Sequence, residues 1–220
     1  QRATMRVDLA PLAALPPTAL PAQGPPLPAL DWWRGRPPLV LDRRAQVYPP
    51  DPTVGWQSPD DLHVRAWLGW DAQRLHLAAV VHDPVHHVEA DDPGRFWQSD
   101  SLQLALDPLN DAGATPGFSA DDREFGLVLG AQGARVVQTA PERRRLDSPV
   151  SIARQGADTI YRVALPWDLI GVSPEAGRVL GISFIVNQNN GQGRAYWMGL
   201  TPGIGEAKRP VAYRDLYLAP

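Results

Sequence analysis

The chain has 220 residues, of which 44% are hydrophobic, enough for one large β domain or for one domain with a long decoration. A formal net charge of −3 without a long basic run argues against nucleic acid as a partner. The absence of cysteine removes disulfides, thiolate metal sites and cysteine nucleophiles, and no apolar run approaches the ~20 residues that cross a membrane.

The first 60 residues differ from the rest because they hold 13 of the 24 prolines. After a possible strand over 4–8, prolines between Leu15 and Leu30 exclude a helix or a central strand, since proline fixes φ and removes a donor. This segment is expected to be extended, either as a linker or, as its leucines favour, as a strap along the domain surface. Trp32 and Trp33 are interpreted as a cap on the core rather than as a ligand platform, and a short strand is expected over 38–41.

From residue 61 onward, short strands alternate with turn residues. One helical turn is expected over 166–171, closed by Gly171. The expected strands cover 62–68, 75–83, 101–107, 124–129, 134–138, 151–154, 159–165, 180–186, 195–200 and 213–218. The pattern predicts an all-β protein, an antiparallel β-sandwich over 61–220 with a proline-rich N-terminal extension over 1–60.

The strand over 101–107 has the clearest alternation. Leu102, Leu104 and Leu106 fall on one side, and the side that carries Gln103 is polar. A period of two describes a strand with one face on a core and the other facing something polar. Trp97 stands at the preceding loop–strand junction, where it can present a flat apolar plate beside hydrogen-bonding groups.

Catalytic motifs are missing from the sequence: it has no Gly-x-Ser-x-Gly elbow, phosphate-binding loop, His-Glu-x-x-His or dinucleotide fingerprint. The 24 acidic residues leave a glycosidase carboxylate pair as an alternative, but most of them lie in turns, where solvated charge is common. The chain is therefore predicted to bind rather than to catalyse.

The histidines cluster between residues 63 and 87. On an extended strand His76 and His82 share a face, and His86 and His87 follow in the next loop. A metal site or haem ligation is one interpretation. The interpretation that we favour is a solvent-facing His76 and solvated loop histidines.

The segment 187–194 is predicted to be a loop and holds the densest set of neutral donors and acceptors, three Asn and two Gln followed by an Arg. Such groups bond vicinal hydroxyls in both directions, although a turn-forming Asn/Gly cluster is an equal alternative. Adding Trp97, Gln103, Tyr196 and Trp197 favours sugar binding, because a pyranose has apolar faces and a hydroxyl rim.

Several motifs, in this order over about residues 60–218, resemble the family 9 carbohydrate-binding modules. They are Trp70-Asp71, Leu75-His76-Leu77, Asp83-Pro84-Val85, Trp97-Gln98-Ser99-Asp100-Ser101-Leu102-Gln103, Asp122-Arg123-Glu124-Phe125-Gly126, Tyr161-Arg162-Val163-Ala164-Leu165-Pro166-Trp167 and Gly181-Ile182-Ser183-Phe184-Ile185-Val186-Asn187 with Gly191-Gln192-Gly193-Arg194. Modules of this family are β-sandwiches, related to DOMON domains and usually attached to secreted glycan-degrading enzymes.

The resemblance implies a non-catalytic module that binds an oligo- or polysaccharide and partners other domains of a glycan-active enzyme. The expected carbohydrate-binding residues are Trp97, Gln103, Asn187, Asn189, Gln192, Arg194 and Trp197. Structural calcium is also implied, with Asp83, Asp100, Asp107 and Asp122 as candidate oxygen donors, each of which fits a solvated turn equally well. No organic cofactor is expected. The expected location is secreted, periplasmic or on the cell surface, and the start at Gln1 without a signal peptide is expected of a mature protein or of a module cut from a longer one.

The sequence departs from the family pattern at three positions. The resemblance implies that the sugar is gripped between two tryptophans, and Trp97 matches the first of them. Leu200 stands where the family places the second, and Gly126 and Val128 stand at places of polar sugar contacts. Two alternatives therefore stay open. One is a DOMON-type redox domain that holds haem through His and either Met5 or Met198. The other is a sandwich that has lost sugar binding and serves as a spacer or docking domain.

Overall fold

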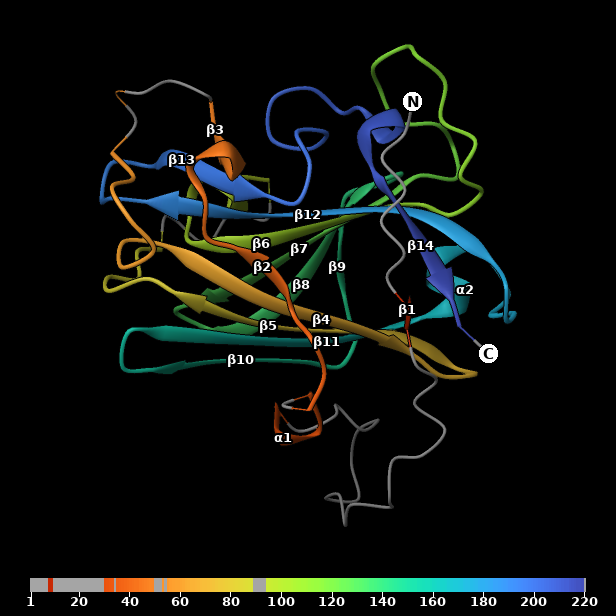
Figure 1. Ribbon diagram of the computed structural model, residues 1–220, viewed down its shortest axis with the longest axis horizontal. Helices are drawn as coiled ribbons and strands as arrows, with labels where there is room; N and C mark the ends of the chain where they lie inside the picture. The colour runs from red at the N-terminus through yellow and green to blue at the C-terminus, as the bar shows by residue number, and fades with distance from the viewer. Residues whose placement is uncertain are drawn as a thin grey trace.

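The computed structural model describes residues 8–9, 30–33, 35–49, 53, 55–88 and 94–219. Two antiparallel sheets face each other in this part of the chain, so the predicted β-sandwich is confirmed (Figure 1). The strap expected between residues 15 and 30 lies outside the described residues, apart from Leu30. No helix in the described ranges is long and apolar enough to cross a membrane.

The larger sheet has nine strands. Along its main path their order is β1-β14-β12-β6-β7-β8-β9, while β13 pairs with β12 and β3 pairs with β13. All pairs in it are antiparallel except β1 with β14. The strands are β1 Asp8–Leu9, β3 Val47–Tyr48, β6 Ser101–Asp107, β7 Arg123–Gly130, β8 Gly133–Ala140, β9 Arg144–Leu146, β12 Val179–Asn189, β13 Arg194–Gly199 and β14 Arg214–Leu218.

The smaller sheet has five strands in the order β10-β11-β5-β4-β2. They are β2 Leu39–Leu41, β4 His63–Trp70, β5 Arg74–His82, β10 Val150–Gln155 and β11 Asp158–Pro166. The helical elements are short: α1 Leu30–Trp33, η2 Arg44–Gln46, η3 Phe96–Gln98, α2 Trp167–Ile170 and η4 Pro210–Ala212. Gly171 closes α2 with φ 93°, as the sequence predicts, because glycine adopts this conformation without strain.

The main core lies between the sheets and contains the inward face of β6. Leu102, Leu104 and Leu106 are fully buried there. The opposite face of β6 is buried as well, since Gln103 is only 4% exposed. The predicted alternation is therefore correct, and the polar face lies beneath loops instead of in open solvent.

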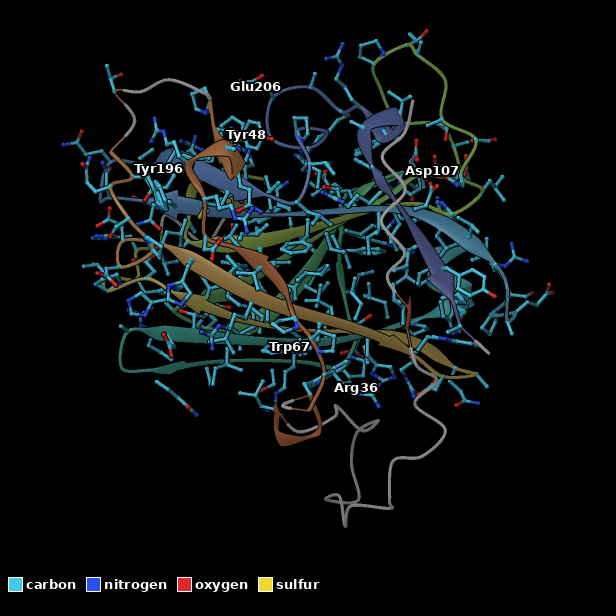
Figure 2. All side chains as sticks on the ribbon, viewed as in Figure 1. Arg36, Tyr48, Trp67, Asp107, Tyr196 and Glu206 are labelled. Atoms are coloured by element: carbon cyan, nitrogen blue, oxygen red, sulfur yellow. The ribbon has the colours of Figure 1, made fainter. Side chains whose placement is uncertain are left out.

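Sheet pairing begins before residue 61. β2 extends the smaller sheet, and β3 pairs with β13 in the larger one. Trp67 on β4 also donates a hydrogen bond of 3.0 Å to the carbonyl of Arg36, which ties this entering segment to the sandwich (Figure 2). The sandwich thus includes residues that the sequence assigns to the extension.

Two local expectations are wrong. His76 is buried at 2% exposure rather than solvent-facing, because Asp71 in the preceding turn places a carboxylate oxygen 2.9 Å from its Nε2. The predicted strand over 180–186 continues as β12 to Asn189, so Asn187 and Asn189 lie in a strand and not in a loop. The extension follows from pairing with Ser101 on one side and with β13 on the other.

Candidate functional site

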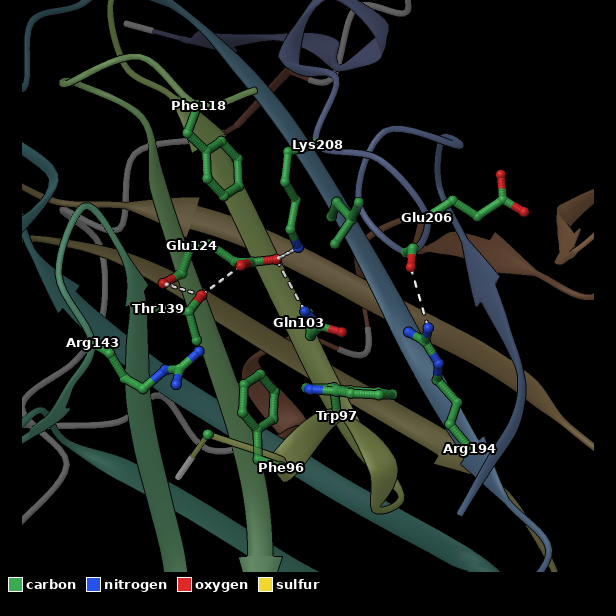
Figure 3. Close-up of a pocket in the computed structure, with 13 residues that line it drawn as sticks. Phe96, Trp97, Gln103, Phe118, Glu124, Thr139, Arg143, Arg194, Glu206 and Lys208 are labelled. Atoms are coloured by element: carbon green, nitrogen blue, oxygen red, sulfur yellow. Dashed lines mark hydrogen bonds and ion pairs between the residues drawn. The ribbon is translucent and has the colours of Figure 1, made fainter. Parts of the chain in front are cut away.

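A cleft of about 400 Å³ opens on the outer face of the larger sheet (Figure 3). Its walls come from η3, β6, β7, β8, the start of β13, and the loops over 108–122 and 200–209. The lining residues are Gly94, Phe96, Trp97, Gln103, Phe118, Glu124, Thr139, Arg143, Arg194, Ile204, Gly205, Glu206 and Lys208. Phe96, Trp97, Phe118 and Ile204 make the lining partly apolar, and charged and amide groups make up most of the rest.

The position of Trp97 depends on Gly126. A Cβ built at residue 126 would lie 2.2 Å from Cε2 of Phe96, so the Phe96 ring rests directly on the glycine backbone. Phe96 is 2% exposed and anchors η3, which carries Trp97 as its next residue. Gly126, a departure from the family pattern, therefore makes room for the aromatic residue that supports Trp97.

The floor of the cleft is a chain of hydrogen bonds across three strands. Nδ2 of Asn187 on β12 donates to Oε1 of Gln103 on β6 at 3.0 Å. Nε2 of Gln103 then donates to Oε1 of Glu124 on β7, also at 3.0 Å. Glu124 is 3% exposed and further accepts bonds from Thr139 and from Nζ of Lys208. The chain fixes which way the Gln103 amide points, because its oxygen and its nitrogen each have a partner.

Arg194 lies between two tryptophans. Its guanidinium carbon is 4.8 Å from the Trp97 ring centroid and 4.3 Å from that of Trp197, within cation–π range. Its donors reach the side-chain oxygen of Asn187 at 3.3 Å and the carbonyl of Gly205 at 3.2 Å. Burial lowers the pKa of this guanidinium, although it remains charged at any physiological pH.

Trp197 is a covered side chain and not an open plate. It is 6% exposed, and a Cβ at Gly205 would lie 2.1 Å from its indole, so the 200–209 loop backbone sits against it. Leu200 packs against the main core rather than lining the cleft. Neither Trp197 nor Leu200 therefore offers a second stacking surface to a ligand at Trp97. Besides Trp97, the aromatic residues that line the cleft are Phe96 and Phe118, the latter from the 108–122 loop.

The structure brings together three of the seven predicted sugar-binding residues, Trp97, Gln103 and Arg194, in the cleft. Asn187 lies behind them, fully buried. The other predicted residues lie elsewhere: Asn189 lines a second hollow of about 340 Å³, Gln192 is exposed outside both, and Trp197 is covered.

Sequence reasoning missed Glu124, Phe118 and Lys208. Glu124 lies within the motif at 122–126, and the alternation of β7 places it on the same face as Gly126, so a signal for it existed. Phe118 and Lys208 stand in irregular loops that are tied together by a hydrogen bond of 2.7 Å from Gly117 N to the Lys208 carbonyl. No periodic pattern could have revealed them.

The four predicted calcium donors separate into two pairs at the two ends of β6. Asp107 and Asp122 meet at one end, where Asp121 joins them with ligand atoms within 4.8 Å of one another. Figure 2 shows Asp107 at the opposite end of the sandwich from Tyr196, which lines the second hollow with Asp83. Asp100, at the start of β6, is close enough to Asp83 that their charges repel.

The Asp107–Asp121–Asp122 cluster fits a hard cation. One carboxylate oxygen each of Asp121 and Asp122 is buried without a hydrogen-bond partner, which a cation ligated by oxygen would remedy. Burial raises the pKa of Asp107 and Asp122, and neighbouring acids raise both further. Bound calcium would neutralise the negative charge of these carboxylates. The calcium that the resemblance implies stays a prediction, and this cluster is the candidate site for it.

Asp100 is held differently. Its carboxylate oxygens accept backbone hydrogen bonds from His87 at 2.5 Å and Asn189 at 2.6 Å. Burial nevertheless raises the pKa of Asp100 to about 7, and Asp83 adds repulsion. These bonds link η3 and its loop to the β12–β13 hairpin, so Asp100 has a structural role.

A two-sheet sandwich with an aromatic-walled, hydrogen-bonding cleft on one outer face defines a ligand-binding module. The chain belongs to the carbohydrate family 9 binding domain-like family, whose model matches residues 45–215. The match begins before residue 61, in agreement with the pairing of β3.

Comparison with known proteins points the same way. Over 125 residues the chain is 27% identical to an endo-1,4-beta-xylanase A of Thermotoga neapolitana, a match that covers 57% of this chain and 11% of the xylanase. The fold is similar to a family 9 carbohydrate-binding module of Caldicellulosiruptor kristjanssonii, solved in complex with cellotriose, with a TM-score of 0.68 and 16% identity over 98% of this chain and 94% of that one. A family 9 carbohydrate-binding module of the same organism, solved in complex with glucose, gives a TM-score of 0.67 and 15% identity over 97% of this chain and 95% of that one.

Proposed function

We propose that this protein is a non-catalytic carbohydrate-binding module that holds a saccharide in the cleft beside Trp97. The observation that carries the proposal is the combination, in one cleft, of a partly exposed indole, the fixed amide of Gln103 and the ion pair between buried Glu124 and partly exposed Lys208. An apolar ring face and a line of oriented donors and acceptors match the two surfaces of a pyranose. Family membership and the sugar complexes of similar modules support this assignment.

Each residue has a distinct task in this proposal. Trp97 stacks on one sugar face, Gln103 and Lys208 bond hydroxyls, and Arg194 holds the indole in place by stacking on it. Because Trp197 is covered and Leu200 points into the core, binding uses a single tryptophan. One stacking surface with a few hydrogen bonds gives weak affinity, with a dissociation constant on the order of μM to mM.

Titration calorimetry of the wild type and Trp97→Ala against cello-, xylo- and other oligosaccharides tests the proposal. We expect the wild type to bind at least one of them and Trp97→Ala to lose that binding. Trp67→Ala is the matched control, since Trp67 is also partly exposed but lies in the smaller sheet. Equal binding by the wild type and Trp97→Ala would remove the cleft as the site. A broad glycan screen without a hit would favour a spacer or docking domain instead.

We also propose that the module is part of a larger protein. The matched stretch of the xylanase is a small part of that enzyme, which is consistent with a module carried by a larger glycan-active protein. We further propose a location outside the cytoplasm, as expected of a module attached to a secreted enzyme. Within such a protein, weak binding by the module would keep the enzyme near its polymeric substrate. The haem alternative has less support, because Met198 is fully buried in the main core.

A further inference from the structure

Among the side chains that line the cleft, positive charges outnumber negative ones. Three of these side chains are cationic, Arg143, Arg194 and Lys208, and two are acidic, Glu124 and Glu206. Lys208 is paired with Glu124. Glu206 acts electrostatically on Arg194, whose own hydrogen bonds go to neutral oxygens. Arg143 is the surplus charge.

Arg143 is an exposed residue between β8 and β9, and its side chain reaches the cleft wall near Thr139 and Phe96 (Figure 3). No carboxylate in the described part of the chain lies within ion-pair distance of it. The guanidinium N–H donors of Arg143 are thus available to a ligand. The guanidinium of Arg194, in contrast, lies between two indoles.

The positive charge continues along the same side of the sheet. Arg145 pairs with Val137, which pairs with Gly126, and cross-strand partners share a face, so Arg145 stands on the cleft side of β9. Arg144 occupies the alternate side, where its Nε and Nη2 both lie 3.2 Å from Oε1 of Gln138. Of the three consecutive arginines, Arg143 and Arg145 therefore lie on the cleft side of the sheet.

We propose that the cleft selects acidic saccharides, with Arg143 binding the carboxylate of a uronic acid whose ring lies beside Trp97. This inference rests on the proposed function and narrows its ligand to a chemical class. A guanidinium binds a carboxylate through two parallel, charge-assisted hydrogen bonds, and a neutral sugar has no group that uses this pair of donors fully. Arg145 adds electrostatic attraction for a second uronic acid in the same saccharide.

The test uses matched ligand pairs that differ only in whether the carboxylates are free or esterified: trigalacturonate with its methyl ester, and glucuronosyl-xylotriose with its methyl ester. By calorimetry, we expect the wild type to bind the acidic member of at least one pair about tenfold more tightly, the contribution of one charged hydrogen-bonding group. This preference should shrink when sodium chloride rises from about 0.05 M to about 0.5 M, since an exposed ion pair is screened.

The variants separate this inference from the proposed function. Arg143→Gln should remove most of the acidic preference, measured as the ratio of the two dissociation constants within each ligand pair. Arg144→Gln, the same charge change on the opposite side, should keep that ratio. Neutral sugars that bind as tightly as acidic ones, and lose binding in Trp97→Ala, would leave the proposed function standing and overturn the selectivity. A preference that survives Arg143→Gln would overturn it as well, and absence of any binding would overturn both.

Discussion

Replacing Gly126 by alanine tests how Trp97 is positioned. The added Cβ would lie 2.2, 2.3 and 2.7 Å from three carbons of the Phe96 ring, whereas carbon atoms in contact stay about 3.5–4.0 Å apart. The ring would have to move by roughly 1.3 Å or more to restore that separation. Because Phe96 is buried, its ring has little free space to move into, so η3 must move with it or the strand must shift.

Overpacking of this kind costs about 1–3 kcal/mol of unfolding free energy. With a urea m-value of about 2 kcal/mol/M, the midpoint should fall by about 0.5–1.5 M. The assay is urea unfolding followed by tryptophan fluorescence, together with saccharide titration, in which Gly126→Ala should also weaken binding because Trp97 follows Phe96 in η3.

Gly113→Ala is the control, because a Cβ there meets nothing within 4 Å, and it should stay within about 0.5 kcal/mol of the wild type. Adding Phe96→Leu to Gly126→Ala should recover part of the loss, with a coupling energy of about 1 kcal/mol. A Gly126→Ala midpoint equal to that of the wild type, or additive effects in the double variant, would contradict the close packing of Phe96 on Gly126.

Three further predictions concern the buried carboxylates. Glu124→Gln should lower the unfolding free energy by about 1–3 kcal/mol in urea, because Lys208 loses its ion pair; an unchanged value contradicts this. Since the Asp100 pKa is raised to about 7, the folded state holds a proton that the unfolded state releases near pH 4, so wild-type stability should fall between about pH 4 and 7. Asp100→Asn should weaken this dependence of the unfolding free energy on pH, and an identical dependence in both proteins would contradict the raised pKa of Asp100. Calcium should raise the melting temperature of the wild type and not of Asp122→Asn, with exposed Asp168→Asn as the control; equal shifts in all three would exclude this cluster.

The strands were predictable because their signal is local. The alternation of β6 was read with its correct ends, and β4, β5, β7 and β11 fall within a residue or two of their expected ranges. β9 was missed because its exposed arginines carry no apolar alternation. The length of β12 was underestimated because Asn and Gln favour turns in isolation, and pairing with β6 and β13 outweighs that preference.

The site was predictable only in part. Trp97 and Gln103 were found because a junction tryptophan next to a polar strand face is a local feature, and both line the cleft. Trp197 follows the same alternation, yet the backbone at Gly205 covers it, a contact that no pattern within β13 encodes.

The sequence alone determined the all-β class, the inward faces of β4, β6 and β12 and the family, because periodicity and motif order are properties of consecutive residues. Which side chains meet depends on the tertiary structure. Gln103 contacts Glu124, which contacts Lys208, across 21 and 84 positions of the chain. Those contacts depend on strand order and loop paths, and they turn a polar strand face into a cleft with oriented donors and one surplus arginine.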